Sequence, residues 1–279
     1  MRLLIGFDDS DAGRDALELG LQLSAAGGDP ATVVTVYPDD DAVAYPKVGP
    51  AIGEAEDTSR VIADHGRLTA ERKLDVARAA VGDRADVRFE AVGPSYASKA
   101  LHEYAEQSEA DLLVIGVTEH AAIGRIAPNS TGERLLNDSP CPVAVAPDGY
   151  RDRGQRIEEV TVAYDGSPES RHALAVARQA AQRVGASVHL VAVAQHEDDA
   201  LRDALESARK EFPDVASADL VTGDDVVDVL ADLPGRPPQL LVCGSRGRGP
   251  LRRVLLGSVS TQLIRKAAYP VVVVPRTAG

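Results

Sequence analysis

Tryptophan is absent from this chain of 279 residues, and phenylalanine occurs only three times. A core without large aromatic side chains must be built from Val, Leu, Ala and Ile, which suits small helices packed closely on a buried parallel sheet. No apolar run approaches the roughly 20 residues that a membrane-spanning helix needs. Two acids, Asp8 and Asp9, precede any hydrophobic region of a signal peptide. We therefore expect a cytoplasmic protein.

Cysteine is almost as scarce, with Cys141 and Cys243 alone in the chain. Two cysteines are too few for a disulfide framework, and they lack the spacing of a metal site. The six histidines show no ligand spacing either, so no metal centre is predicted. Cys243 ends an apolar run and is expected to be buried as a small apolar residue, whereas Cys141 lies between prolines and is expected to be exposed.

Negative charge exceeds positive charge, and the excess is confined to one half. The net charge is −13, and residues 1–150 hold 13 Lys and Arg against 26 Asp and Glu. Residues 151–279 hold 17 of each kind and are neutral. An acidic surface repels nucleic acids and anionic membranes, so neither is an expected partner. Solubility is the simplest reason for the excess as a whole.

The chain contains an internal repeat. Asp8 and Ser10 end the motif LLIGFDDS, and Asp165 and Ser167 occupy the same places in VTVAYDGS, 157 positions later. Further along, the apolar run LLVIG at 112–116 corresponds to LLVCG at an offset of 128. A repeat of this length indicates two copies of one structural unit.

The two copies differ in length in their middle parts. The offset falls by 29, so the first copy has extra residues between about 38 and 90, including a Pro- and Gly-rich stretch at 37–53 that is typical of a surface loop. We predict one domain over residues 1–147, a polar linker over 148–156 and a second domain over 157–279.

Each copy alternates short apolar runs with helical patterns, which is typical of βαβ units and a parallel sheet. Ser10 and Ser167 are predicted helix caps, and Pro168 suits a first turn. The fold class is therefore α/β, with two doubly wound domains. In the second copy we predict strands at about 159–164, 187–194, 217–222, 239–243 and 270–274, and helices at about 168–184, 198–211, 224–232 and 257–267.

A glycine-rich loop follows the fourth strand of the second copy. Its pattern, G-x2-G-x9-G-S, begins at Gly244 and continues through Gly247 to Gly257 and Ser258. Glycines let backbone N–H groups approach an anion, and a helix beginning at Ser258 offers free N–H groups and a favourable dipole. Four arginines add positive charge to this segment: Arg246, Arg248, Arg252 and Arg253. The loop is neither a Walker A loop nor a Rossmann fingerprint, and glycines that only turn the chain are the simpler alternative.

With this loop and the repeat, the chain resembles the ATP-binding branch of the universal stress protein family over nearly its whole length. The resemblance implies a five-stranded sheet in the order 3-2-1-4-5 in each half, halves related by a pseudo-two-fold axis, and antiparallel pairing of the two last strands. It also implies nucleoside contacts at Ala163 and Asp165, adenine contact at Val193 and ribose contact at Gly244. The residues implied to line the phosphates are Gly247, Gly257, Ser258, Val259 and Ser260.

The first copy departs from this pattern in its loop. Glu119 and Asn129 occupy the places of the second and third glycines. Asn tolerates positive φ, but Glu119 directs a carboxylate at the phosphate position. We predict a weak or lost site there. Its remaining members are Asp8, Val36, Gly116, Asn129 and Ser130.

These features favour a nucleotide-binding regulatory protein of the stress response, with ATP, ADP or AMP as ligand and an unidentified protein partner. Mg²⁺ carried by the nucleotide is compatible with this hypothesis, although no carboxylate cage is evident. The alternative is a slow ATPase or adenylyl-transfer enzyme, which needs a positioned base near the phosphates. A scaffold with two vestigial sites is a third possibility, and a further homodimer stays open. No catalytic residue is predicted, so we expect no primary enzymatic role.

Overall fold

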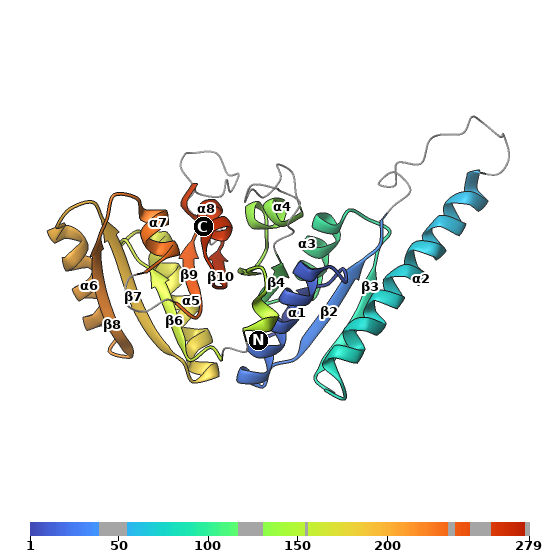
Figure 1. Ribbon diagram of the computed structural model, residues 1–279, viewed down its shortest axis with the longest axis horizontal. Helices are drawn as coiled ribbons and strands as arrows, with labels where there is room; N and C mark the ends of the chain where they lie inside the picture. The colour runs from blue at the N-terminus through green and yellow to red at the C-terminus, as the bar shows by residue number, and fades with distance from the viewer. Residues whose placement is uncertain (39–54, 117–130, 154–155, 234–237, 246–257, 277–279) are drawn as a thin grey trace.

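The computed structural model describes residues 1–38, 55–116, 131–153, 156–233, 238–245 and 258–276 (Figure 1). Its strands form one ten-stranded sheet in the order β3-β2-β1-β4-β5-β10-β9-β6-β7-β8. Each half therefore has the predicted order 3-2-1-4-5. The predicted fold class, two doubly wound parallel sheets, is confirmed.

The first half carries five strands and four helices. The strands are β1 (Leu3–Gly6), β2 (Ala31–Val36), β3 (Val87–Val92), β4 (Leu112–Gly116) and β5 (Val143–Ala146). The helices are α1 (Asp11–Gly27), α2 (Ala55–Val81), α3 (Ala97–Gln107) and α4 (Thr131–Asn137). A short 3-10 turn, η2 (Tyr150–Asp152), then leads to the second half.

The second half repeats the same sequence of elements. Its strands are β6 (Glu159–Ala163), β7 (Ser187–Ala194), β8 (Val215–Thr222), β9 (Leu241–Gly244) and β10 (Val271–Val274). Its helices are α5 (Pro168–Val184), α6 (Asp199–Glu211), α7 (Val226–Ala231) and α8 (Ser258–Lys266). All nine predicted elements of this half are present, with ends that differ by at most two residues.

Much of the extra length of the first half lies in one helix. Helix α2 has 27 residues, whereas its counterpart α6 has 13. The loop predicted over 37–53 falls almost entirely outside the described residues. The added turns of α2 continue away from the sheet at the outer end of the first half (Figure 1).

The halves join through their last strands, as the resemblance implied. Strands β5 and β10 pair antiparallel, with Val143 opposite Val273 and Val145 opposite Val271. Every other pairing in the sheet is parallel. Because each half contributes the same strand to this junction, the two halves are related by a pseudo-two-fold axis through it.

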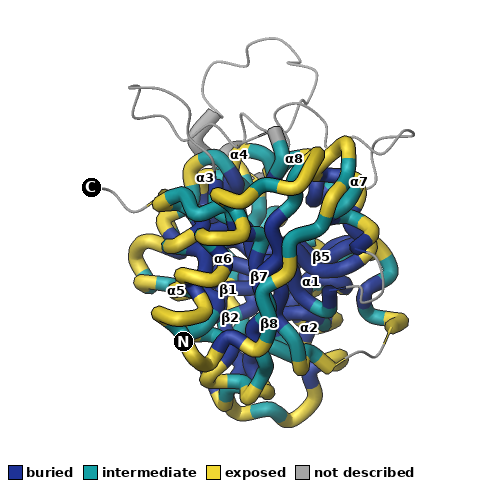
Figure 2. Tube along the Cα trace, turned by 90° about the vertical axis from the view of Figure 1, so that its left-hand side faces the viewer, coloured by how far each residue is buried: buried dark blue, intermediate teal, exposed yellow. Residues whose placement is uncertain are grey.

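Helices cover both faces of the sheet, and the buried strands lie between them (Figures 1 and 2). Apolar residues of α1, α2, α5 and α6 share one core cluster with the inward residues of the strands. Residues of α3, α4, α7 and α8 form the second cluster on the opposite face. Burial on both faces explains why the strands are continuous apolar runs instead of alternating ones.

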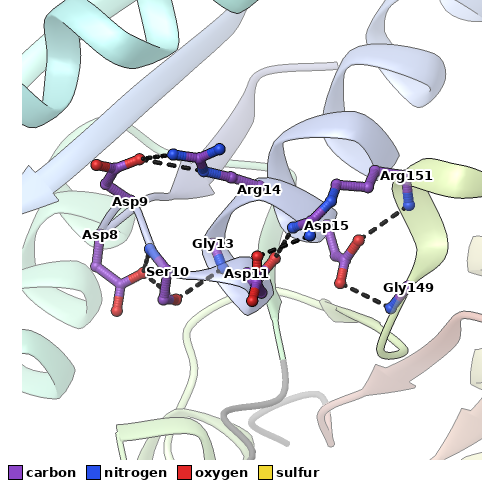
Figure 3. A network of polar contacts seen from close by, with 9 residues as sticks. All are labelled: Asp8, Asp9, Ser10, Asp11, Gly13, Arg14, Asp15, Gly149 and Arg151. Carbon is purple, nitrogen blue, oxygen red and sulfur yellow. Dashed lines mark hydrogen bonds and ion pairs between the residues drawn. The ribbon is translucent and has the colours of Figure 1, made fainter.

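The segment between the halves packs against α1. The carboxylate of Asp15, which is buried in α1, accepts hydrogen bonds of 2.9 Å from the backbone N–H groups of Gly149 and Arg151 (Figure 3). Between them, Tyr150 is buried and donates from its hydroxyl to Oε1 of Gln22 at 2.7 Å. The polar composition of this segment did not predict that Tyr150 is buried.

Candidate functional site

The sheet order creates one crevice in each half at the carboxyl ends of its strands. In the second half, β6 is followed by β7 on one side, and the chain later returns to β9 on the other side. The gap between β6 and β9 is therefore a topological switch point, where open α/β sheets bind their ligands. Strands β1 and β4 form the corresponding point of the first half.

A tight turn after β6 presents the first predicted site residue. Oδ1 of Asp165 accepts from the Ser167 hydroxyl at 2.5 Å and from the Ser167 backbone N–H at 3.1 Å. Gly166 between them has φ of 74°, a left-handed conformation that glycine adopts without strain. Ser167 in turn caps α5 by accepting from the N–H of Ser170, which confirms the predicted cap.

The hydroxyl of Ser170 adds a support that the sequence analysis missed. It accepts from the backbone N–H of Asp165 at 3.3 Å and donates to the carbonyl of Ser167 at 3.1 Å. Ser170 is buried under the turn. The first turn of α5 therefore holds both the backbone and the carboxylate of Asp165 in place.

Gly244, the last residue of β9, allows this strand to lie close to the start of α5. A Cβ atom at Gly244 would lie 2.8 Å from the carbonyl oxygen of Glu169. In the first half, a Cβ atom at Gly116 would lie only 1.9 Å from the carbonyl oxygen of Ala12. Both positions thus require glycine for helix–strand packing, whatever they contact in a ligand.

Residues of three strands (β6, β7 and β9) and three helices (α5, α7 and α8), with the turn after β6, line a cavity of about 130 Å³ at the second-half switch point. Six of the predicted site residues line it: Ala163, Asp165, Val193, Gly244, Val259 and Ser260. The apolar walls also include Val226 and Leu230 of α7, which sequence reasoning missed. Their apolar spacing indicated only a helix, and nothing in it identified which face meets the cavity.

The start of α8 lines the cavity next to the end of β9. Ser260 is buried, and its hydroxyl donates to the carbonyl of Gly244 at 3.3 Å. The backbone of Ser258 begins the helix, so the first N–H groups of α8 have no acceptor within it. The predicted residues Arg246, Gly247, Arg248 and Gly257 lie outside the described residues.

Two carboxylates, Asp165 and Glu169, line this cavity. Glu169 is ion-paired with Arg276, and this hydrogen bond holds the pKa of the Glu169 carboxyl below its usual range. Asp165 is engaged by Ser167 as described above. A general base usually has a raised pKa, and Glu169, whose pKa is lowered, lacks this property.

The first half has a matching cavity of about 170 Å³. Three of the residues predicted for its weak site line it: Asp8, Val36 and Gly116. Asn129 and Ser130 lie outside the described residues, as does Glu119. Within the described residues, the two cavities lie at equivalent places in the two halves.

The first turn of α1 reproduces the turn after β6 with one change (Figure 3). Oδ1 of Asp8 accepts from the Ser10 hydroxyl at 2.5 Å, and Ser10 caps α1. Asp9, at the place of Gly166, has φ of 63° and is ion-paired with Arg14 at 2.8 Å. A non-glycine residue with positive φ is uncommon, although Asp tolerates it better than most residues.

The two cysteines are inert in this structure. Cys243 lines the second-half cavity, but burial raises the pKa of its thiol to about 11. The expectation that Cys141 is exposed was wrong. Cys141 lies just before the buried strand β5, belongs to the same core cluster as Val143, and is only 4% exposed. Burial raises the pKa of the Cys141 thiol to about 11 as well. Both thiols are therefore protonated near neutral pH and are poor nucleophiles.

The described ranges hold no group of three or more His, Cys, Asp or Glu side chains that is placed to bind a metal ion. None of the described helices combines the length and the apolar character needed to cross a bilayer.

The fold and the paired crevices define a tandem α/β protein with two related halves and a candidate ligand site in each. The profile of the Universal stress protein family matches residues 1–147 and 219–275. The chain therefore belongs to the universal stress protein family.

Individual relatives agree with this assignment. A universal stress protein of Mycobacterium tuberculosis is 31% identical over 230 residues, which span 75% of this chain and 77% of the relative. Another from the same species is 25% identical and covers 99% of this chain and all of the relative. The crystal structure of a universal stress protein from Archaeoglobus fulgidus matches the fold with a TM-score of 0.73, at 22% identity, over 99% of this chain and 98% of that one.

Proposed function

We propose that this chain is a nucleotide-binding regulatory protein that holds one adenine nucleotide, ATP, ADP or AMP, in its second half. One observation carries the proposal. Six residues assigned to the site from sequence, drawn from β6, β7, β9 and α8, line a single cavity at a topological switch point. Membership of the universal stress protein family supports it.

The residues of the cavity suit the parts of a nucleotide. Val193, Val226 and Leu230 provide apolar surface for a base, and the Asp165 carboxylate, which lines the same cavity, is an acceptor type that suits ribose hydroxyl groups. The volume of about 130 Å³ lies below the roughly 300 Å³ of a typical small-molecule pocket, so these walls suit the nucleoside end. The phosphates then belong at the first turn of α8, where the helix dipole favours anions.

The loop sequence places the nucleotide in one half. Glu119 stands where the second loop glycine is needed, and a carboxylate 4 Å from a phosphate costs about 4 kcal/mol at an effective dielectric of 20. That corresponds to about a thousandfold in affinity. The second half instead carries Gly247 at this position and four arginines nearby.

A matched pair of substitutions tests the assignment. Asp165→Ala and Asp8→Ala each remove a carboxylate that accepts a hydrogen bond from the hydroxyl of a helix-capping serine. Both substitutions should therefore weaken the adjoining turn to a similar extent. Only Asp165→Ala should weaken ATP or AMP binding in calorimetry, by about tenfold or more, the range of hydrogen bonds to a charged group. Equal losses from both substitutions, or none from either, would contradict a second-half site.

The identity of the resident nucleotide requires a separate measurement. Mass spectrometry of the supernatant from denatured, freshly purified protein should release an adenine nucleotide at up to one equivalent per chain. Gly247→Glu protein, prepared in parallel, should release none. Protein that carries no nucleotide and binds none when ATP, ADP or AMP is added would contradict the proposal.

We further propose that catalysis is not the main role of this site. The lining carboxylates are held by Ser167 and Arg276, and a bound base is poorly suited to activate water. We predict ATP turnover far below the enzyme median of about 10 per second. Steady-state phosphate release that approaches this rate and is abolished by Gly247→Glu would favour the alternative, an ATPase.

A further inference from the structure

A cavity of about 620 Å³ lies away from both crevices. It runs beside α5 on the face of the sheet that α1 and α5 cover, next to the junction of β5 and β10. Its apolar walls include Val176 and Ala180 of α5, Val242 and Val272 of the sheet, and Pro275. We call this space the α5 groove. Its volume falls within the range of about 300–1,000 Å³ typical of sites that bury a small organic molecule.

The groove is lined by residues of both halves, and the pseudo-two-fold axis relates its α5 side to a place beside α1 that the protein itself fills. Helices α1 and α5 correspond residue by residue at the repeat offset of 157, so Gln22 corresponds to Gln179 and Asp15 to His172. Pro147 corresponds to Pro275 at the offset of 128. Gln179, His172 and Pro275 all line the α5 groove.

Tyr150 occupies the corresponding place beside α1. It is 2% exposed, and its hydroxyl donates to Gln22 at 2.7 Å. The N–H groups on either side of it are held by Asp15 (Figure 3). The first half therefore fills its groove with an aromatic ring whose hydroxyl binds a glutamine amide.

The second half has no such ring to offer. At the offset of 128, the position of Tyr150 corresponds to Ala278, which has neither a ring nor a hydroxyl. The amide of Gln179 has no hydrogen-bond partner among the described residues and lines the groove where Gln22 meets the phenol. The α5 groove thus keeps the recognition elements and lacks the group they recognise.

The acidic groups and Arg276 at the groove are already engaged by the protein. Asp29 is ion-paired with Arg183 and with the Met1 ammonium, Arg276 is ion-paired with Glu169, and Asp111 accepts a hydrogen bond from the backbone N–H of Arg2. A charged ligand would have to compete with these pairs, whereas an uncharged ligand would not. The ligand class indicated is therefore neutral and aromatic.

We propose that the α5 groove is a binding site for an uncharged hydroxylated aromatic compound of two or three rings. The ring system lies on the apolar walls, and the hydroxyl donates to the amide oxygen of Gln179 as Tyr150 does to Gln22. This site is separate from the nucleotide crevice, so it stands or falls independently of the function proposed above.

Binding of 2-naphthol and of naphthalene to the full chain tests the proposal. The absence of tryptophan leaves a low protein background for the fluorescence of both probes. Wild-type protein should bind one 2-naphthol per chain, up to about tenfold tighter than naphthalene, because only the naphthol can donate a hydrogen bond to the exposed amide of Gln179. No saturable binding of 2-naphthol to wild-type protein would overturn the proposal.

Matched variants assign the site. Gln179→Leu should abolish the preference for 2-naphthol over naphthalene, whereas Gln22→Leu, at the position already used by Tyr150, should preserve it. Ala180→Trp should fill the groove and remove binding of both probes. Equal effects of the two glutamine substitutions, or binding that survives Ala180→Trp, would place the probe elsewhere and overturn the assignment.

Two further variants test the pseudo-symmetry argument and the competing occupant. Tyr150→Ala should open the α1 side and raise the stoichiometry of 2-naphthol from one to two per chain, and circular dichroism should establish that this variant is folded. A folded Tyr150→Ala protein that still binds one probe would contradict the equivalence of the grooves. Binding that appears only after removal of residues 277–279 would assign the groove to the chain's own tail and overturn the proposal.

Discussion

The two halves share one scaffold and differ in what fills or completes it. Asp8 with Ser10 and Asp165 with Ser167 make the same turn, with hydroxyl-to-carboxylate distances of 2.5 Å in both. The first-half crevice has lost its loop glycines, whereas the second-half crevice keeps them. Beside the helices the situation is reversed, because Tyr150 fills the first-half groove and the second-half groove is open. The two halves thus differ both in the loop sequence at the crevice and in the space beside α1 and α5.

The largest expected effect concerns the loop. Gly247→Glu introduces into the second half the residue type that Glu119 provides in the first. We expect ATP affinity to fall by about a thousandfold, or about 4 kcal/mol, measured by calorimetry. Arg248→Glu serves as a control for charge without loss of the glycine and should cost less, because a long side chain can turn away into solvent. Unchanged affinity in Gly247→Glu would show that the loop does not meet the phosphates.

Removal of the buried tyrosine should have the next largest effect. Tyr150→Ala leaves a cavity beside α1 and an unpaired Gln22 amide, and we expect a loss of about 3–5 kcal/mol in the free energy of unfolding in urea. Tyr150→Phe keeps the ring and should lose only about 1 kcal/mol, the usual contribution of one hydrogen bond. Similar losses for both variants would mean that the hydroxyl, and not the ring, anchors the segment between the halves.

The strand-end glycines provide a direct comparison of packing in the two halves. A Cβ atom at Gly116 would meet backbone at 1.9 Å, and one at Gly244 would meet it at 2.8 Å. Gly116→Ala should therefore cost about 2–3 kcal/mol of unfolding free energy, and Gly244→Ala about 1–2 kcal/mol. Gly132→Ala is the control, because its nearest atom lies 3.7 Å away. The reverse order of costs would contradict the packing described here.

The smallest expected effect concerns the ion cluster between the halves. Burial alone would raise the pKa of Asp29, but the hydrogen bonds from Arg183 and from the Met1 ammonium outweigh it and hold the pKa below its ordinary value. The paired carboxylate therefore stabilises the fold above pH of about 4, and this contribution is lost as pH falls through the lowered pKa. Because Arg183 is 41% exposed, we expect less than about 1 kcal/mol.

Urea unfolding at a series of pH values between about 2 and 6 measures this contribution. Asp29→Asn should flatten the loss of stability on acidification. Asp214→Asn provides a comparison, because its partner Arg178 lies in the same half and Asp214 has a lowered pKa for the same reason. A wild-type and an Asp29→Asn protein with identical pH profiles would show that the cluster contributes nothing.

Sequence reasoning predicted the fold because the relevant signals are local and repeated. Apolar runs, the caps Ser10 and Ser167, and the glycines ending β4 and β9 each depend on a few neighbouring residues. A repeat also allows each half to be compared with the other. These signals were sufficient to predict the strand order with the help of the family resemblance, and the structure confirmed it.

Other features depend on contacts between distant residues and were not predictable in this way. Ser170 and Leu230 line the second-half cavity only because α5 and α7 present those faces to it. The burial of Cys141 and of Tyr150 likewise depends on the helices that cover them. Tyr150 sits in a polar segment, and only its partner Gln22, 128 residues earlier, shows why it is buried.

The number of nucleotides bound per chain tests the central comparison most directly. Titration of wild-type protein with ATP in a calorimeter should give a ratio near one, because only the second half has the complete loop motif in its sequence. The double change Glu119→Gly and Asn129→Gly should move the ratio toward two, since the described walls of the first-half cavity are already in place. A wild-type ratio near two, or binding at full affinity in Gly247→Glu, would contradict the account.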